Sequence, residues 1–393
     1  MPDSALASVL DSSRAALPSA ALLAQLTQRL AASASEHDRR AAFPSENFAL
    51  LQRHGLLGLT LPRELGGAGA DLACARQVIA AVAKGEPSTA LILVMQYLQH
   101  FRLGQASGWP AHLRERVARS ALDDGALINA LRVEPDLGTP ARGGLPACVA
   151  RRSADGWRLS GRKIYSTGSH GLTWLLVWAR SDEDDPRVGG FLVHRDTPGL
   201  QIVEDWDHLG MRASCSHEVR FDDVLIPLDH ALGLGRASER QAENQGEALV
   251  WLNVLLSSVY DGVARAARDW LLGFLHERRP SNLGASLASL PRFQEVVGRI
   301  DTLLFTSATL LDAAAQGQVD AAHAGQLKQV VTSNAIRAVE LAIEAAGNPG
   351  LSRHNPLERH YRDVLCARVH TPQDDSVFAG AGRSALAAVE RPA

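Results

Sequence analysis

The sequence has few cysteines and lacks any long uninterrupted apolar run. It contains four cysteines in 393 residues, and no two of them form a CxxC pair. They are Cys74, Cys148, Cys215 and Cys366. This scatter argues against a disulfide framework or a zinc site and is typical of a reducing compartment. No stretch of about 18 charge-free apolar residues is present, so the sequence predicts no transmembrane helix.

The sequence also lacks a strong charge of either sign and a signal-peptide pattern at its start. Its formal net charge is −3, so no global field favours nucleic acid or an anionic membrane. No basic segment followed by an apolar one opens the chain, so no signal peptide is expected. We therefore expect a cytoplasmic protein with neither nucleic acid nor membrane as a partner.

Hydrophobic spacing changes twice along the chain and predicts three domains of an α+β fold. Residues 1–124 predict an all-helical domain, with Asp71 as the N-cap of a helix running toward Lys84. Residues 125–238 contain short β-prone runs between turns and predict an antiparallel, barrel-like β domain. Residues 239–393 predict a four-helix bundle. Its long helical stretches are expected near 243–277, 288–316, 319–346 and 356–384.

Five sequence strings then occur in a recognisable order. They are P-x-E-x-G-G-x-G at 62–69, V-E-P-D-L-G-T at 133–139, G-x-K-x-Y-S-T-G at 161–168, L-G-x-R-x-S followed by F-x-D-V-x-I-P within 209–227, and P-L-E-R-x-Y-R-D at 356–363. Together they resemble the acyl-CoA dehydrogenase superfamily over nearly the whole chain. The resemblance implies a flavin-dependent oxidoreductase that assembles as a homotetramer or dimer, but it does not fix the reaction.

The resemblance places the flavin between the β domain and the bundle, with FAD as the expected cofactor. Tyr165 would pack beside the ring system, and Ser166 or Thr167 would offer a hydroxyl near N5. Val133 and Thr139 would line the pyrimidine and phosphate side. Such partners are needed because unpaired polar atoms in a buried heteroaromatic group are costly.

The loops that hold the pyrophosphate of FAD in the family are altered in this chain. The first reads R-R-P-S-N-L-G at 278–284 and keeps Arg279, and the second reads E-A-A-G-N-P-G at 344–350 and keeps Gly347 and Gly350. An arginine and backbone amides therefore remain for phosphate. The family's phenylalanine and glutamine are missing, so FMN or a transiently bound reduced flavin is the alternative to FAD.

The family's catalytic glutamate is absent from both positions where its members carry it. Counting onward from the last motif places Thr371 at one position, and the other falls near Leu252 on the first long helix of the bundle. A neutral threonine cannot take a proton from a substrate. The neighbouring His370 is the candidate, because an imidazole acts as base or hydrogen-bond donor near neutral pH.

The local pattern from Asn355 to Pro372 is closer to a branch containing two-component flavin monooxygenases. These enzymes accept reduced flavin from a separate reductase and need a polar pocket that excludes water. Gln96 and Tyr97 could contact the substrate there, and His100 could take part in catalysis, since Gln96 and His100 share one helix face.

Three functions therefore stay open. One is an FAD-dependent dehydrogenase of an acyl-CoA-like substrate, with electron-transfer flavoprotein as its partner. The second is a monooxygenase that oxidises a small organic substrate with O₂ and is supplied by a flavin reductase. The third, a catalytically silent flavin-fold binding protein, is disfavoured by the retained residues 165–167.

No metal is expected, because Asp374 and Asp375 fit a solvated loop or a helix N-cap better than a metal pair. Asp374 is an outside candidate for the missing base.

Overall fold

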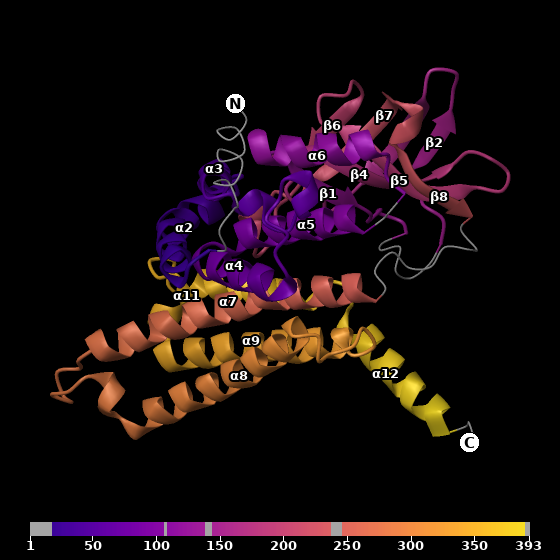
Figure 1. Cartoon of the computed structure of the whole chain (residues 1–393). Coiled ribbons are helices and arrows are strands. Elements are labelled where there is room, and N and C mark those ends of the chain that lie inside the picture. The colour runs from indigo at the N-terminus through magenta and orange to yellow at the C-terminus, as the bar shows by residue number, and fades with distance from the viewer. Residues whose placement is uncertain (1–17, 106–107, 138–143, 237–245, 390–393) are drawn as a thin grey trace, which may run out of the picture.

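The computed structural model describes residues 18–105, 108–137, 144–236 and 246–389. Its N-terminal part is helical, as predicted, and packs between a sheet and a bundle of longer helices (Figure 1). The N-terminal helices are α2 (Ala20–Arg40), α3 (Ser45–Arg53), α4 (Leu72–Gly85), α5 (Pro87–Gly104) and α6 (Ala111–Asp123).

Local sequence signals explain where α4 and α5 begin. The carboxylate of Asp71 accepts a hydrogen bond from the Cys74 amide at 2.9 Å, so Asp71 is the N-cap of α4 as predicted. Helix α5 begins at Pro87, which needs no amide hydrogen there, and the Glu86 carboxylate caps the helix. Before α4, a Cβ on Gly67 would lie 2.2 Å from the Leu61 carbonyl oxygen, so this turn requires glycine.

The middle domain is one sheet of eight strands with the order β6-β7-β3-β2-β4-β5-β8, and β1 pairs with β4. The strands are β1 (Leu127–Leu131), β2 (Val149–Arg152), β3 (Trp157–Lys163), β4 (Leu172–Ser181), β5 (Arg187–His194), β6 (Leu200–Val203), β7 (Glu218–Ile226) and β8 (Ala231–Arg236). The antiparallel prediction is correct for most neighbours. It is wrong for β1–β4 and β2–β4, which are parallel because both connections cross over other parts of the chain.

Alternate residues of β1 enter two different cores, which fixes the sheet between helices on both faces. Leu127 and Leu131 join the large core that also contains α5 and the bundle. Ile128 belongs to a second core with Leu113 and Val117 of α6. Because side chains alternate along a strand, this pattern places α5 and α6 against opposite faces of β1.

The C-terminal part is a helical bundle, but its fourth predicted stretch is broken. Its long helices are α7 (Glu247–Glu277), α8 (Pro291–Ala315) and α9 (Ala324–Ala346). The predicted stretch 356–384 instead forms α11 (Leu357–Leu365), a 3-10 turn at Cys366–Arg368, and α12 (Asp374–Val389). Pro372 explains the interruption, since the residue before a proline avoids the helical conformation.

Helix α7 lies at the centre of the molecule and packs against α4, α5, α8, α9 and α11 (Figure 1). Every residue from 253 to 264 is buried. Such burial around the whole helix is typical of a central position, and here it includes the polar side chains of Asn253 and Asp261.

A single arginine joins three parts of the fold. The guanidinium of Arg362 in α11 donates to both carboxylate oxygens of Asp38 in α2, at 2.9 and 2.6 Å. It also donates to the main-chain oxygen of Leu209, in the segment between β6 and β7, at 2.8 Å. This bidentate contact therefore fixes α11 against both the N-terminal helices and the β domain.

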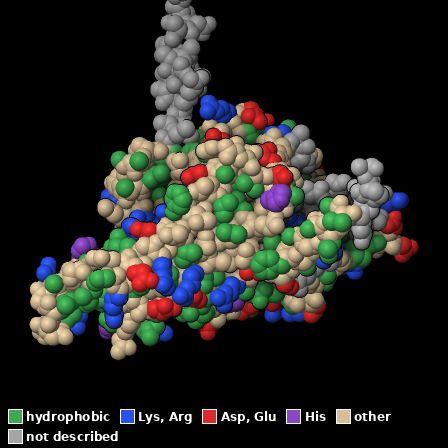
Figure 2. All heavy atoms as spheres, turned by 90° about the horizontal axis from the view of Figure 1, so that it is seen from below, with side chains coloured by type: hydrophobic (Ala, Val, Ile, Leu, Met, Phe, Trp, Pro, Cys, Tyr) green, Lys and Arg blue, Asp and Glu red, His purple; other side chains and the backbone are tan. Residues whose placement is uncertain are grey.

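The outer face of the bundle carries exposed hydrophobic side chains. Phe305 of α8 is 73% exposed and Leu386 of α12 is 72% exposed. Seen from below, hydrophobic side chains are spread over this face among acidic and basic ones (Figure 2). The homotetramer or dimer stays a prediction. None of the described helices is both long and apolar enough to cross a membrane.

Candidate functional site

The segment 164–168, which follows β3, forms one wall of the site. The main chain of this segment is fixed from two sides: the Ile164 amide donates to the Val133 oxygen at 3.0 Å, and the Ser166 amide donates to the His217 oxygen at 3.3 Å. The Asn129 side chain donates to the Thr167 oxygen at 3.0 Å. Three strands or loops therefore hold the residues that the sequence assigned to the flavin.

The hydroxyl of Ser166 has no hydrogen-bond partner among the described residues, although Ser166 is only 1% exposed. The hydroxyl of Thr167, in contrast, accepts from Ser216 at 3.2 Å. A buried hydroxyl without a partner is costly, so Ser166 needs a polar group that the chain itself does not supply. The polar edge of a flavin would supply one, and the residues present therefore fit the expected cofactor.

A buried ion pair supports this wall from behind. The ammonium of Lys163 lies 2.6 Å from the Glu134 carboxylate, and both side chains are buried. Burial raises the pKa of Glu134, but hydrogen bonds from Lys163 and from the amides of Ala147 and Cys148 outweigh it, and the net shift is downward. Val133 is half-buried beside this pair, and Thr139 lies outside the described residues.

Backbone conformations of higher energy concentrate around this wall. Tyr165, Met211 and Cys215 have φ values of 54°, 52° and 43°. For residues other than glycine such a conformation costs on the order of 1–3 kcal/mol and persists only where the surroundings impose it. Tyr165 is 55% exposed, so its ring is available for contact with a ligand.

The loop 366–372 carries His370, and we take it as the second wall of the candidate site. The Tyr260 hydroxyl lies 2.7 Å from Nδ1 of His370. The loop main chain is held by Lys328 of α9, whose ammonium donates to the His370 and Pro372 oxygens at 2.7 and 2.8 Å. Thr371, the residue at the family's glutamate position, is half-buried in this loop.

The protonation states of Tyr260 and His370 determine the direction of their hydrogen bond. Burial raises the pKa of Tyr260 well above its ordinary value, so the phenol keeps its proton. Burial and, after it, the Lys328 charge lower the pKa of His370 to about 4, so the imidazole is neutral near pH 7. The phenol has no other partner among the described residues, and it must therefore donate to Nδ1. The ring proton then resides on Nε2, and His370 presents a hydrogen-bond donor.

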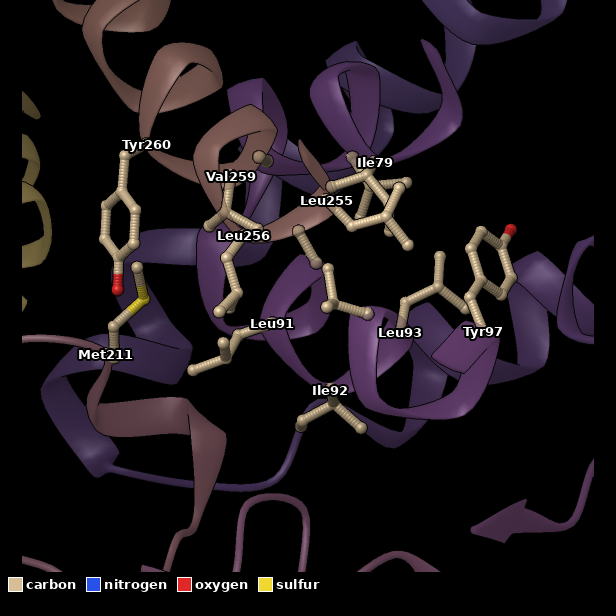
Figure 3. Packing of buried hydrophobic residues seen from close by; sticks show 14 of the residues in the cluster. Ile79, Leu91, Ile92, Leu93, Tyr97, Met211, Leu255, Leu256, Val259 and Tyr260 are labelled. Atoms are coloured by element: carbon tan, nitrogen blue, oxygen red, sulfur yellow. The ribbon is translucent and has the colours of Figure 1, made fainter. Parts of the chain in front are cut away.

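Met211 and Trp206 connect the two walls. The Tyr165 ring contacts Trp206 edge to face at 6.3 Å, and the Trp206 indole donates to the Met211 oxygen at 3.2 Å. The Met211 side chain lies beside Tyr260 (Figure 3), and the Met211 amide donates to the Asp363 carboxyl at 2.7 Å. A series of contacts through Trp206, Met211 and Tyr260 therefore links the 164–168 segment to the 366–372 loop.

Comparison with known proteins assigns the fold and the site to a family. Models of the acyl-CoA dehydrogenase N-terminal, middle and C-terminal domains match residues 20–101, 132–224 and 254–374. The putative acyl-CoA dehydrogenase YdbM of Bacillus subtilis is 33% identical over 88% of this chain and 90% of its own length. The chain belongs to the acyl-CoA dehydrogenase superfamily.

Other proteins that resemble this chain carry names other than acyl-CoA dehydrogenase. L-evernosamine nitrososynthase of Micromonospora sp. is 31% identical, over 87% of this chain and 83% of that protein. The X-ray structure of KijD3 in complex with FMN and dTDP-3-amino-2,3,6-trideoxy-4-keto-3-methyl-D-glucose superimposes with a TM-score of 0.80 at 29% identity. It covers 98% of this chain and 95% of that one. This acyl-CoA dehydrogenase homologue is thus a flavin-dependent oxidoreductase, as the motifs indicated.

Gln96, Tyr97 and His100 lie within the helical domain of this acyl-CoA dehydrogenase homologue. All three are 0% exposed. The Gln96 amide binds the main chain at Ala126 and Ile128, and the Tyr97 hydroxyl donates to the Leu56 oxygen. Figure 3 shows Tyr97 at the opposite end of the labelled cluster from Tyr260. The structure therefore does not bring these residues to His370, and their roles in substrate binding and catalysis stay predictions.

The residues expected to bind phosphate lie apart from the two walls. Arg279 is exposed in the connection between α7 and α8, at the end of the bundle farthest from the sheet (Figure 1). Gly347 ends α9 with a φ of 65°, and Gly350 is buried in the short helix α10 (Asn348–Leu351). Their role in phosphate binding stays a prediction, which within this superfamily would involve a second subunit.

Three potential metal ligands lie beside the flavin wall, but their hydrogen bonds argue against a metal. His170, Cys215 and His217 have ligand atoms within 4.8 Å of one another. Nδ1 of His217 accepts from the amides of Asp205 and Trp206, both at 3.0 Å, so the neutral ring carries its proton on Nε2. Burial raises the pKa of Cys215 to about 12. The Nδ1 lone pair of His217 is thus already used, and the Cys215 sulfur is a protonated thiol near neutral pH, a much weaker metal ligand than a thiolate.

Two residues of this acyl-CoA dehydrogenase homologue that sequence reasoning missed are Tyr260 and Lys328. Tyr260 lies within the apolar run of α7, where it looks like an ordinary core aromatic. Lys328 lies one turn from Ala324 and Val331, on the apolar stripe of α9. A lysine on such a stripe was the available signal, because lysine is rarely fully buried without a partner.

Proposed function

We propose that this protein is a flavin-dependent monooxygenase that accepts reduced flavin from a separate reductase and uses O₂ to oxidise a small organic substrate. One observation carries the proposal: the Tyr260 hydroxyl lies 2.7 Å from Nδ1 of His370 and has no other partner among the described residues, from which we infer that it donates there and that Nε2 carries the ring proton. A dehydrogenase of acyl thioesters needs a group here that accepts a proton from carbon. A neutral imidazole with a protonated Nε2 instead stabilises a developing negative charge by donating a hydrogen bond.

The other polar groups of the site agree with this assignment. The unpaired hydroxyl of Ser166 comes from the first wall, and the Nε2 proton of His370 comes from the second. When bound between them, the flavin supplies the two electrons that O₂ chemistry requires. The chain's own part is to orient the ring through the 164–168 segment, to exclude water, and to hold a proton at Nε2 of His370.

The relatives support FMN or a transiently bound flavin over tightly bound FAD. KijD3 is described with FMN and an amino sugar nucleotide, and the nitrososynthase is named for its amino sugar. In this chain, Arg279 and Gly347 lie apart from the two walls, which leaves the diphosphate of FAD with few partners in a single subunit. A flavin reductase is then the required protein partner.

An FAD-dependent acyl-CoA dehydrogenase is the second candidate, because YdbM, at 33% identity, carries that name. Visible spectra of the purified protein separate the two. A yellow protein that is bleached by an acyl-CoA would support the dehydrogenase and contradict the monooxygenase. A colourless protein that incorporates ¹⁸O from O₂ into an amine or another small substrate, when reduced FMN is supplied by a reductase, would support the monooxygenase.

His370→Ala tests the residue that carries the proposal. The variant should bind reduced flavin as the wild type does but form oxygenated product at least tenfold more slowly, since a single donor of this kind contributes on the order of 10²–10³ in rate. Flavin affinity is measured by fluorescence, independently of turnover. Unchanged product formation would remove His370 from the reaction.

A further inference from the structure

Lys328 is a fully buried lysine whose ammonium group is surrounded by main-chain carbonyls. It is 0% exposed and donates to the oxygens of Ala367, His370 and Pro372 at 3.3, 2.7 and 2.8 Å. An ammonium group has three N–H donors, so these three contacts satisfy it. All three acceptors belong to the loop that carries His370.

Lys328 differs in this respect from the other fully buried lysine of the described chain. Lys163 pairs with the Glu134 carboxylate at 2.6 Å, whereas no carboxylate lies within ion-pair distance of Lys328 among the described residues. Burying a charge without an opposite charge is expensive, and an apolar side chain on this stripe of α9 would avoid that cost. The charge of Lys328 therefore lowers the stability of the folded protein compared with an apolar side chain. All its hydrogen bonds go to the loop 366–372.

We propose that Lys328 is a positioning residue for His370, holding the loop main chain so that the imidazole meets Tyr260 and presents its Nε2 proton to the site. The same positive charge opposes a second proton on the ring. The His370 main chain is thus fixed by Lys328 and its side chain by Tyr260. The inference rests on the proposed function only for the use that the reaction makes of the Nε2 proton.

The charged and titratable groups around His370 shift the pKa values of His370, Lys328 and Tyr260. Burial and then the charge of Lys328 lower the pKa of His370. Asp374, in the first turn of α12, acts on Lys328 and raises its pKa against the larger effect of burial. Burial and, after it, Cys366 and Asp363 of α11 raise the pKa of Tyr260 and keep the phenol protonated. Removing the charge of Lys328 should therefore raise the pKa of His370, whereas burial still holds it below its ordinary value.

Two substitutions at position 328 separate the charge from the hydrogen bonds. Lys328→Met keeps the volume and removes both, and the pKa of His370, measured by NMR of ¹⁵N-labelled histidine, should rise by roughly one unit. Lys328→Arg keeps the charge, but a planar guanidinium cannot direct three donors from one nitrogen. It should therefore leave the His370 titration nearly unchanged. Product formation should fall at least tenfold in both variants.

A double-mutant cycle tests whether Lys328 acts through His370. In a His370→Asn background, Lys328→Met should cause no further loss of product formation, since interacting residues are not additive. Arg268→Met is the matched control. It breaks the ion pair between α7 and α8, whose Nε–Asp301 distance is 2.8 Å, and should lower thermal stability without moving the His370 titration.

An equal loss of turnover in both backgrounds would overturn the inference, as would an unchanged His370 titration in Lys328→Met. If Lys328→Met does not fold, the same cycle is run with Lys328→Arg. If the inference is correct, Lys328→Arg lowers product formation in the wild-type background and causes no further loss in the His370→Asn background. The NMR titration needs neither reduced flavin nor substrate. A protein that fails to oxygenate anything but shows the shifted titration would refute the proposed function and leave the role of Lys328 intact.

Discussion

Tyr260→Phe is the most direct test of the hydrogen-bond direction on which the site depends. The substitution removes one oxygen atom from a core position that is 0% exposed, and the phenyl ring keeps its packing beside Met211 (Figure 3). What is lost is the donor to Nδ1 of His370 at 2.7 Å. A buried acceptor that loses its partner costs about 1–3 kcal/mol.

Without the Tyr260 hydroxyl, Nδ1 is unpaired in either tautomer, so the Nε2-protonated form loses its advantage over the Nδ1-protonated form. The Nε2 donor is then absent from the site in part of the molecules. If about 1.4 kcal/mol of the cost of the lost hydrogen bond appears in the reaction barrier, product formation falls about tenfold. Thermal stability should change little, because no apolar contact is removed.

The assay is product formed per O₂ consumed, with reduced flavin supplied at a constant rate, together with ¹⁵N NMR of the His370 ring. We expect lower product yield and partial protonation of Nδ1. Tyr361→Phe is the control, since it removes a phenol from the adjacent helix α11 and leaves the Tyr260–His370 bond in place. Wild-type yield combined with an unchanged ring spectrum in Tyr260→Phe would refute the argument.

Two further predictions concern stability. Gly67→Ala should lower the free energy of unfolding by about 1–3 kcal/mol, because its Cβ would lie 2.2 Å from the Leu61 oxygen. Gly273→Ala is the control, since its Cβ would meet nothing within 4 Å, and it should be neutral or slightly stabilising. Chemical denaturation measures both. Acid should destabilise the protein through His100 and His360, since burial lowers the pKa of each to about 3. Both rings are neutral when folded, so between about pH 6.5 and 3 only the unfolded chain takes up these protons, and each residue should cost about 2 kcal/mol at pH 5. The loss between pH 7 and pH 5 should be smaller in His100→Gln; an equal loss would show that His100 does not contribute.

The sequence predicts well where the signal is local. Asp71 was expected to cap α4 because capping depends on a residue and its next three neighbours, and the structure shows that bond. The split between α11 and α12 was missed, although Pro372 carried the signal. The parallel pairing of β1 and β2 with β4 could not be predicted, because periodicity shows that a strand exists and not which strand lies beside it.

The site follows the same division. The Tyr165-Ser166-Thr167 wall was predicted from a contiguous motif, and His370 was predicted by counting from another. Tyr260 and His370 are 110 residues apart, and Lys328 and His370 are 42 apart. Contacts between residues so far apart in the sequence form only when whole helices pack together, so no local sequence pattern predicts them. The donor role that we propose for His370, in place of a base, rests on its contact with Tyr260.

The contact of Arg362 with Asp38 has a consequence for the synthesis of the protein. The two residues are 324 positions apart, so the carboxylate on α2 leaves the ribosome long before its guanidinium partner is made. At ordinary translation rates that interval is on the order of tens of seconds. Until nearly the whole chain has emerged, the N-terminal helices must therefore either fold without their contact with α11 or be bound by a chaperone. Ribosome profiling with a folding reporter should find that the N-terminal helices acquire full protease resistance only after α11 is translated.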